Sequence, residues 1–332
     1  FIILKTILFY SNVKSLKYFS LQKFYKIDIE ILKSMGYTVK LTRSILPFFK
    51  FYKYDIAFLY FFRYSFFAGL ISRFFNKKVY FTGGIDNLDK DYASLKKYNI
   101  QKLFFKLCYV ISDKIFIVSK ADLNNVALIQ SNFMNKCVLN QHSIDVNNFL
   151  LNDFEVKKNI ISTICWMVTD ENVKRKGIIE SIEVYNSNPY LKNNFKYYVL
   201  GSFGQGTDKI KKYLDLNNLN NNVFLLGELT EDDKIKQLKE SKFYFQLSKY
   251  EGFGIAALEA FASGCQVIHS GKGNLKYLFE GYCVNINEID LETLNFEKSL
   301  TTFESNYLRE IKDLLIKNYS LRSRKTKFEN IL

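Results

Sequence analysis

The chain has 332 residues, 48% of them hydrophobic and 24% charged, which is the size and composition of a globular protein of about two domains. These values exclude a disordered chain, a disulfide-stabilised miniprotein and a fibre. Forty-seven Lys and Arg residues against 33 Asp and Glu residues give a net charge of +14, which favours an anionic partner such as nucleic acid, an anionic membrane surface or a phosphate-bearing substrate.

The sequence favours a cytoplasmic location. Residues 1–10 are apolar, but Lys5 interrupts them and no small-residue cleavage site follows, so we expect a first buried strand and not a signal sequence. The apolar stretch 56–75 is broken by Arg63 and Arg73 and is therefore not expected to span a membrane. Five scattered cysteines without a CxxC pair indicate reduced thiols and neither a disulfide framework nor a zinc site.

Short apolar runs alternate with longer helical patterns, which predicts βαβ units around parallel sheets and an α/β fold class. In the first half we expect strands at 7–10, 38–42, 56–60, 78–81, 114–118 and 137–140. In the second half we expect them at 160–166, 196–200, 222–226, 243–247 and 266–269. A polar stretch follows the first set, so we place a boundary between two doubly wound domains at residues 153 and 154.

The segment 246–273 carries the richest pattern. An apolar strand leads to Glu251, a Gly-Phe-Gly turn and a helical run closed by Gly264. The glycines allow a ligand to approach the backbone, and the N-terminus of the following helix favours an anion, so we expect a phosphate site. Glu251 and Glu259 add two carboxylates that can accept hydrogen bonds from neutral hydroxyls, which sugars offer.

This pattern resembles the E-x7-E signature of retaining nucleotide-sugar glycosyltransferases with the GT-B fold, in particular glycosyltransferase family 4 (group 1). The matching positions are Ser248, Glu251, Gly252, Phe253, Gly254, Leu258, Glu259, Ala260 and Gly264. Further segments between residues 112 and 273 fall in the family's order. The resemblance implies two Rossmann-like domains facing a central cleft, an acceptor domain at 1–153, a donor domain at 154–316, and a C-terminal helix at 317–332 that packs back on the first domain.

The resemblance also implies roles for single residues. Glu251 would contact hydroxyls of the donor sugar, and Glu259 those of the ribose. Lys176, with Arg175 or Lys174 beside it, would offset the charge that builds on the departing diphosphate, where cations and a helix N-terminus have to stabilise it. The remaining donor-binding positions are the phosphate loop Gly252, Phe253, Gly254 and Ile255, and the base pocket Gly201, Leu226 and Gly227.

Both domains depart from the family pattern. The glycine-rich loop after the first strand is absent, and Trp166-Met167 stand where the family has Gly-Arg. The fourth strand is followed by Gly83, Gly84 and Asp86 in place of the family's histidine. Ligands of doubly wound sheets bind beyond the carboxyl ends of strands, so we take these three residues, with His142 at the domain crossover, as acceptor-side candidates.

Several other residues have plainer interpretations. The basic run 174–176 can also be a solvated helix start. Asp89 and Asp91 form a DxD triplet, but they lie on an expected polar loop, so we predict no metal site. His269 ends a buried strand and is expected to be structural.

The resemblance thus implies transfer of a sugar from a nucleoside diphosphate sugar to a glycan or lipid-linked acceptor, with retention, in surface polysaccharide biosynthesis, and with no further cofactor. The alternatives are a GT-B-like sugar-nucleotide epimerase or hydrolase and a non-catalytic polyanion-binding protein. No nucleic-acid motif is present, so no nucleic acid is expected.

Residues 1–80 hold 14 Lys and Arg against 3 Asp and Glu, together with 23 aromatic residues, which favours peripheral association with anionic lipid on the inner face of the plasma membrane.

Overall fold

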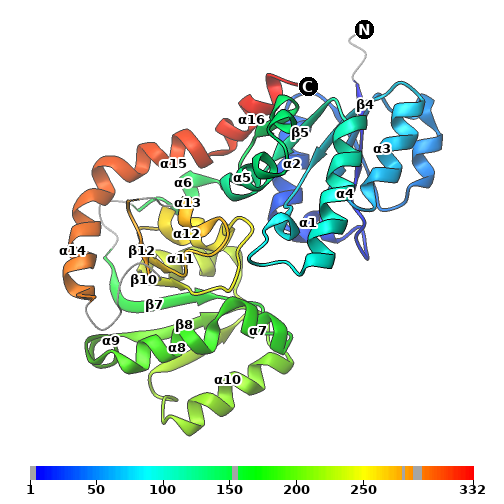
Figure 1. The fold of residues 1–332 in the computed structure, drawn as a ribbon. Helices are drawn as coiled ribbons and strands as arrows, with labels where there is room; N and C mark the ends of the chain where they lie inside the picture. The colour runs from blue at the N-terminus through cyan, green and yellow to red at the C-terminus, as the bar shows by residue number, and fades with distance from the viewer. Residues whose placement is uncertain (1–4, 152–155, 279–280, 287–293) are drawn as a thin grey trace. The chain divides into compact units, whose positions relative to one another are not determined.

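The computed structural model describes residues 5–151, 156–278, 281–286 and 294–332 (Figure 1). The chain divides into two units, one made of Phe1–Ile144 with Asn318–Leu332 and the other of Asp145–Lys317. The boundary expected at 153 and 154 falls within residues 152–155, which lie outside the described residues, and it stays a prediction.

The first unit is built on a six-stranded sheet in the order β2-β1-β3-β4-β5-β6, in which all neighbouring strands are parallel. Alternate residues of β1 face opposite sides: Ile7 and Phe9 enter one apolar cluster, and Leu8 and Tyr10 enter the other. Both faces of the sheet are therefore covered, as expected for parallel strands. The strands are β1 Thr6–Tyr10, β2 Thr38–Thr42, β3 Ile56–Tyr60, β4 Lys78–Thr82, β5 Lys114–Ile117 and β6 Cys137–Leu139.

Helices connect these strands and cover the two faces of the sheet (Figure 1). The α-helices are α1 Tyr18–Leu21, α2 Lys23–Ser34, α3 Ser65–Phe74, α4 Leu95–Ile111, α5 Lys120–Ile129 and the C-terminal α16 Leu321–Glu329. The 3-10 helices are η1 Leu46–Phe49, η2 Phe51–Lys53, η3 Asp86–Leu88 and η4 Ser131–Asn135.

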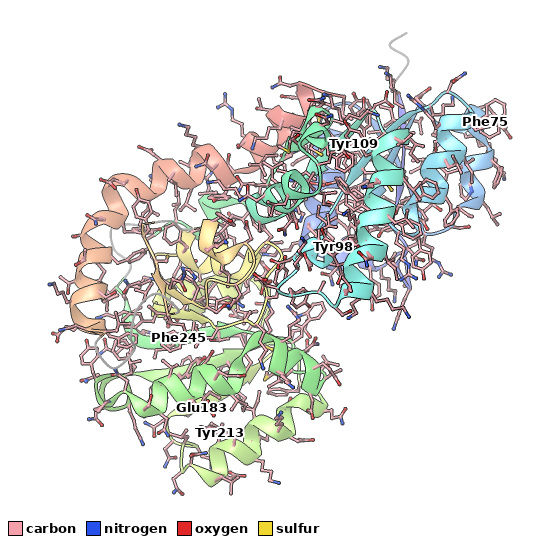
Figure 2. The ribbon with its side chains drawn as sticks, viewed as in Figure 1. Phe75, Tyr98, Tyr109, Glu183, Tyr213 and Phe245 are labelled. Carbon is pink, nitrogen blue, oxygen red and sulfur yellow. The ribbon has the colours of Figure 1, made fainter. Side chains whose placement is uncertain are left out.

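The second unit has a six-stranded parallel sheet of its own, in the order β12-β11-β10-β7-β8-β9. Phe245 on β10 lies within its buried apolar cluster (Figure 2). The strands are β7 Lys158–Ile164, β8 Lys196–Leu200, β9 Val223–Gly227, β10 Ser241–Gln246, β11 Gln266–His269 and β12 Val284–Asn285. The helices are α6 Val146–Phe149, α7 Asp170–Lys176, α8 Ile178–Ser187, α9 Pro189–Asn194, α10 Gln205–Leu216, α11 Glu231–Glu240, α12 Ile255–Ala262, α13 Leu275–Leu278, α14 Phe296–Asn306, the π-helix η5 Tyr307–Ile311 and α15 Lys312–Tyr319.

The C-terminal helix α16 returns to the first unit, as expected. Arg324 on α16 is buried there and donates from Nε to Asp28 Oδ1 at 2.5 Å and from Nη2 to Asp28 Oδ2 at 2.8 Å. Tyr60 Oη donates to the same carboxylate at 2.5 Å. Arg324 Nη1 also donates to the carbonyl oxygens of Asn140 and Gln141, which follow β6. A buried charge needs partners of this kind, and here they fix the chain's last helix to the unit that contains its first strand.

The α/β fold class is confirmed, and each strand expected from the sequence is present within two residues of its expected ends. The strand β12 was not expected, because two residues carry no periodic pattern. Within the part of the chain that the structure describes, no helix is long and apolar enough to cross a membrane. All five cysteines are free thiols.

Candidate active site

The second unit gathers its candidate residues at one edge of its sheet. Because the strands are parallel, the loops that follow β7, β8, β10 and β11 all leave from their carboxyl ends, where doubly wound sheets bind ligands. Glu251 lies on the loop after β10, and Lys176 ends α7, which follows β7. The sequence places these residues 75 positions apart, and the fold brings them together.

Glu251 and Lys176 form an ion pair with 2.7 Å between Lys176 Nζ and Glu251 Oε2. Each side chain is 15% exposed, so the pair is largely shielded but still reaches solvent. An ammonium group has three N–H donors, so one bond to Glu251 leaves capacity for an arriving anion. The pair therefore offers a cation to a phosphate and a carboxylate to a hydroxyl at one point.

The neutral side chains of Gln246 and Ser248 orient the Glu251 carboxylate. Gln246 Nε2 donates to Glu251 Oε2 at 3.3 Å, and Ser248 Oγ donates to the same oxygen at 3.2 Å. Tyr244 Oη donates to Gln246 Oε1 at 3.0 Å and so fixes the amide orientation. Glu251 is thus held at the end of a buried polar chain that runs along β10.

This environment sets the protonation of Glu251. Burial by itself would raise the pKa of the carboxyl. The Lys176 charge and hydrogen bond, the Arg175 charge and the Ser248 hydrogen bond lower it, and together they outweigh burial, so that the pKa lies below its ordinary value. Glu251 is therefore ionised at neutral pH and accepts hydrogen bonds without donating any.

A glycine allows α7 to reach the β10 loop. Gly177 ends α7 in the left-handed region, with φ of 63°, and a Cβ at this position would lie 2.0 Å from the Leu247 carbonyl oxygen. The adjacent Lys249 N–H donates to the Arg175 carbonyl at 2.8 Å. Close backbone packing, which only glycine permits here, thus carries Lys176 to Glu251.

The loop after β11 supports the expected phosphate loop. Asn274 donates from its backbone N–H to the Glu251 carbonyl at 2.8 Å and from Nδ2 to the Phe253 carbonyl at 3.1 Å. Gly254, with φ of 95°, starts α12, and Ile255 is its first residue. These hydrogen bonds hold the short loop between Glu251 and the N-terminus of α12, which begins only four residues after Glu251.

Glu259 lies on α12 and is almost completely buried. Its Oε2 accepts a hydrogen bond from Lys234 Nζ of α11 at 2.8 Å, and Lys234 also lies 3.1 Å from Glu231 Oε1. A buried carboxylate requires such a partner. Lys234 was not expected from the sequence, because a lysine in a charged helix is ordinarily solvated.

The expected base-pocket residues meet at the ends of β8 and β9. Gly201 N–H donates to the Gly227 carbonyl at 2.8 Å, and Leu226 is the extra residue of a register shift, since Val199 pairs with Leu225 and Leu200 with Gly227. The fold therefore brings Gly201, Leu226 and Gly227 together.

The acceptor-side candidates lie in the first unit. Gly83, with φ of 113°, and Gly84 follow β4, and Asp86 begins η3. The buried Asp122 accepts a weak hydrogen bond from the Ile85 N–H at 3.4 Å and lies close enough to Asp86 for the two carboxyls to interact. Burial and Asp86 raise the pKa of Asp122 well above its ordinary value.

His142 is also buried in the first unit. Burial and the nearby Arg324 charge lower its pKa well below the ordinary value, so its imidazole is neutral.

The Asp89 carboxylate accepts hydrogen bonds from the Asp91 and Tyr92 N–H groups at 2.9 and 3.3 Å and so closes a turn. Among the described residues, no group of three or more His, Cys, Asp or Glu side chains is arranged to hold a metal ion.

Comparison with known sequences identifies a glycosyltransferase domain. The family model "Glycosyl transferases group 1" matches residues 168–283, which include every candidate site residue of the second unit. The chain is 28% identical over 187 residues to the poly(glycerol-phosphate) alpha-glucosyltransferase of Bacillus subtilis, covering 54% of this chain and 26% of that protein. It is 29% identical over 162 residues to the poly(ribitol-phosphate) alpha-N-acetylglucosaminyltransferase of Staphylococcus aureus, covering 46% and 31%. The chain thus spans between a quarter and a third of these relatives.

Comparison with solved structures shows the GT-B fold. Anabaena HepE, solved with UDP and glucose, superposes with a TM-score of 0.71 at 12% identity and 98% coverage of both chains. Sucrose-phosphate synthase from Thermosynechococcus elongatus gives 0.73 at 12% identity, again with 98% of both chains. Staphylococcus aureus TarM gives 0.63 at 20% identity, covering 83% of this chain and 54% of that one.

Proposed function

We propose that the protein is a retaining glycosyltransferase of family 4 that moves a sugar from a nucleoside diphosphate sugar to a glycan or lipid-linked acceptor in surface polysaccharide biosynthesis. The observation that carries this proposal is the Lys176–Glu251 ion pair beside the N-terminus of α12. It combines a cation and helix N–H groups for a diphosphate with an ionised carboxylate for sugar hydroxyls.

The comparisons support the donor class and the stereochemistry. HepE is described with UDP-glucose as well as with UDP. Both curated relatives are named for forming alpha linkages. A nucleotide sugar with an alpha anomeric bond that yields an alpha product has reacted with retention, so their names agree with that part of the proposal.

The proposed chemistry assigns one task to each group. Glu251 accepts hydrogen bonds from the donor sugar, and Glu259, oriented by Lys234, accepts them from the ribose. Lys176, Arg175 and the α12 N-terminus stabilise the negative charge that develops as the bond from the anomeric carbon to the diphosphate oxygen breaks. The acceptor oxygen then bonds to the anomeric carbon on the same face, and its proton passes to the departing phosphate oxygen. No metal or further cofactor takes part in this route.

The acceptor side rests on less specific groups. We place it at Gly83, Gly84, Asp86 and His142 of the first unit, following the general rule for ligands of doubly wound sheets. The relatives are named for polymers of glycerol phosphate and ribitol phosphate, which suggests phosphate-bearing glycans as the first acceptors to test.

The experiment combines each nucleotide sugar of a UDP, GDP, TDP and CMP panel with poly(glycerol phosphate), poly(ribitol phosphate) or a lipid-linked sugar. The expected result is release of the nucleotide only when an acceptor is present, with the anomeric configuration of the donor retained in the product by NMR. An inverted linkage would overturn the stereochemistry. Turnover of the nucleotide sugar without acceptor would support an epimerase or hydrolase instead, and no turnover together with tight polyanion binding would support a binding protein.

A further inference from the structure

The first unit carries a surface in which large apolar side chains stand exposed among cations. Between Gly36 and Ile85 the sequence holds eight Lys and Arg residues and one acidic residue, Asp55. Asp55 Oδ2 accepts a hydrogen bond from the Thr6 backbone N–H at 2.8 Å. Within this segment, Asp55 is thus the one negative charge that offsets eight positive charges.

Three short elements of this segment, η1, η2 and the end of α3, form one surface. Tyr54, which follows η2, donates from Oη to the Phe48 carbonyl of η1 and contacts Ser72 Oγ of α3, both at 3.1 Å. Phe51 of η2 stacks on Phe75 at the end of α3, with ring centroids 4.4 Å apart, and Figure 2 labels Phe75. These contacts hold the exposed residues in fixed positions relative to one another.

We define the apolar-basic patch by what this arrangement leaves in solvent. Phe74 is 81% exposed, Tyr52 71% and Leu46 70%, and Phe49 and Phe51 are also exposed. Lys50 and Lys53 are exposed between them, and Lys53 Nζ lies 5.8 Å from the Tyr52 ring centre. Monomeric proteins rarely expose clustered aromatic side chains of this size unless something binds there.

We propose that the apolar-basic patch docks on an anionic lipid bilayer. Aromatic rings prefer the boundary between headgroups and acyl chains, and each lysine near an anionic leaflet adds electrostatic attraction. A soluble polyanion, such as a polymer of phosphates, would be bound by the lysines alone and would leave Tyr52 and Phe74 without a partner. The combination of both residue types therefore favours lipid.

The patch is also placed so that docking leaves the acceptor-side candidates open. η2 and α3 end just before β3 and β4 begin, so the patch lies at the amino edge of the sheet. Gly83, Gly84 and Asp86 follow β4 at the carboxyl edge. A bilayer at one edge of this sheet does not cover the other.

The test is sedimentation of the full chain with vesicles of phosphatidylcholine, with or without phosphatidylglycerol, at physiological salt. We expect binding only to the anionic vesicles. Lys50→Glu with Lys53→Glu should weaken it by at least roughly 30-fold, from about 1 kcal/mol per cation. The double variant Tyr52→Ser with Phe74→Ser should weaken vesicle binding more than the control double variant Leu128→Ser with Leu216→Ser. The control side chains are equally exposed and lie on α5 and α10.

Other outcomes overturn the proposal. If Lys211→Glu with Lys212→Glu on α10 weakened vesicle binding as much as Lys50→Glu with Lys53→Glu, binding would depend on net charge and not on the patch. Unchanged vesicle binding by the Tyr52 and Phe74 variant, with inorganic polyphosphate as an effective competitor, would assign the lysines to a polyanion. Circular dichroism of each variant establishes that it is folded. Since no donor residue is involved, failure of nucleotide-sugar binding and failure of vesicle binding are separate results.

Discussion

Lys176 and Glu251 stand out at the scale of single residues because their charges are shielded and yet accessible. A shielded pair is not in itself a strong source of stability, since removing two charges from water costs about as much as their attraction returns. The loss of one partner is different, because the other then remains partly buried without its counter-charge. This asymmetry separates the site pair from ordinary surface pairs.

Replacing Lys176 by methionine tests this asymmetry. Lys176→Met should lower the free energy of unfolding by about 1–3 kcal/mol, because it leaves the Glu251 carboxylate without its main partner. The control is Lys249→Met, whose partner Glu180 lies 3.4 Å away and where both side chains are about half exposed. That change should cost about 0.5 kcal/mol or less in urea unfolding. Equal costs for the two variants would show that the Lys176–Glu251 pair behaves as a surface contact.

The lowered pKa of Glu251 predicts a pH dependence. A carboxyl whose pKa is lower in the folded than in the unfolded chain adds stability above its unfolded pKa, near 4.5, and that stability disappears as the pH falls through the folded pKa. The stability difference between the wild type and Glu251→Gln should therefore be constant near neutral pH and shrink below about pH 4.5. Urea unfolding at pH 7, 5 and 4 measures it, and a difference that grows on acidification contradicts the assigned direction.

At the scale of elements, the site depends on how closely α7 packs on the loop after β10. Lys176 reaches Glu251 only because Gly177 sits against the Leu247 carbonyl. The short loop between β10 and α12 is held in the same way by Asn274 from the loop after β11. Backbone contacts between loops thus position the side chains, and the loops themselves need little regular structure.

Gly177→Ala is expected to separate α7 from this loop. The added methyl group meets the Leu247 carbonyl oxygen and also requires a left-handed backbone conformation, so both stability and nucleotide-sugar affinity should fall. Gly281→Ala is the control, because Gly281 has φ of 85° but no atom of the described residues within 4 Å of the added Cβ. It should lose about 1 kcal/mol of stability and no affinity. If both variants bind donor like the wild type, the α7 contact does not position Lys176.

The sequence could predict the elements but only part of this packing. The strands followed from apolar runs, and Glu251, Gly254 and Glu259 followed from fixed spacing within one segment. Lys234 could not be recognised, because its partner Glu259 lies on another helix and its own neighbours are ordinary surface charges. Gln246 and Tyr244 were likewise hidden within a strand whose pattern indicates only burial.

At the scale of the whole chain, an ion pair links two segments that lie near opposite ends of the sequence. Asp28 near the N-terminus and Arg324 near the C-terminus form a pair shielded from water inside the first unit. The resemblance predicted that the last helix returns there, but neither residue was singled out, since a buried pair leaves no mark in composition or spacing. The pair makes α16 an integral part of the first unit.

Arg324→Met should lower the stability by about 3–5 kcal/mol, because it leaves Asp28 as a buried charge without a cation. Adding Asp28→Leu should restore much of the loss, since the double variant leaves no unpaired charge buried at this position. Lys325→Met removes a neighbouring, partly exposed cation, 3.7 Å from Glu329, and should have little effect. Urea unfolding of the three proteins measures these differences, and equal losses for Arg324→Met and Lys325→Met would exclude a structural role for the pair.

The central claim is that the second unit binds a nucleoside diphosphate sugar through Lys176 and Glu251. The most direct measurement is the melting temperature of the full chain with each nucleotide sugar of the panel. At a hundred times its dissociation constant, the true donor should add about 2.7 kcal/mol of stability, and the melting temperature should rise with its concentration. Lys176→Met should require a higher concentration for the same rise. No rise with any nucleotide sugar, in a wild-type protein that melts cooperatively, would contradict the account.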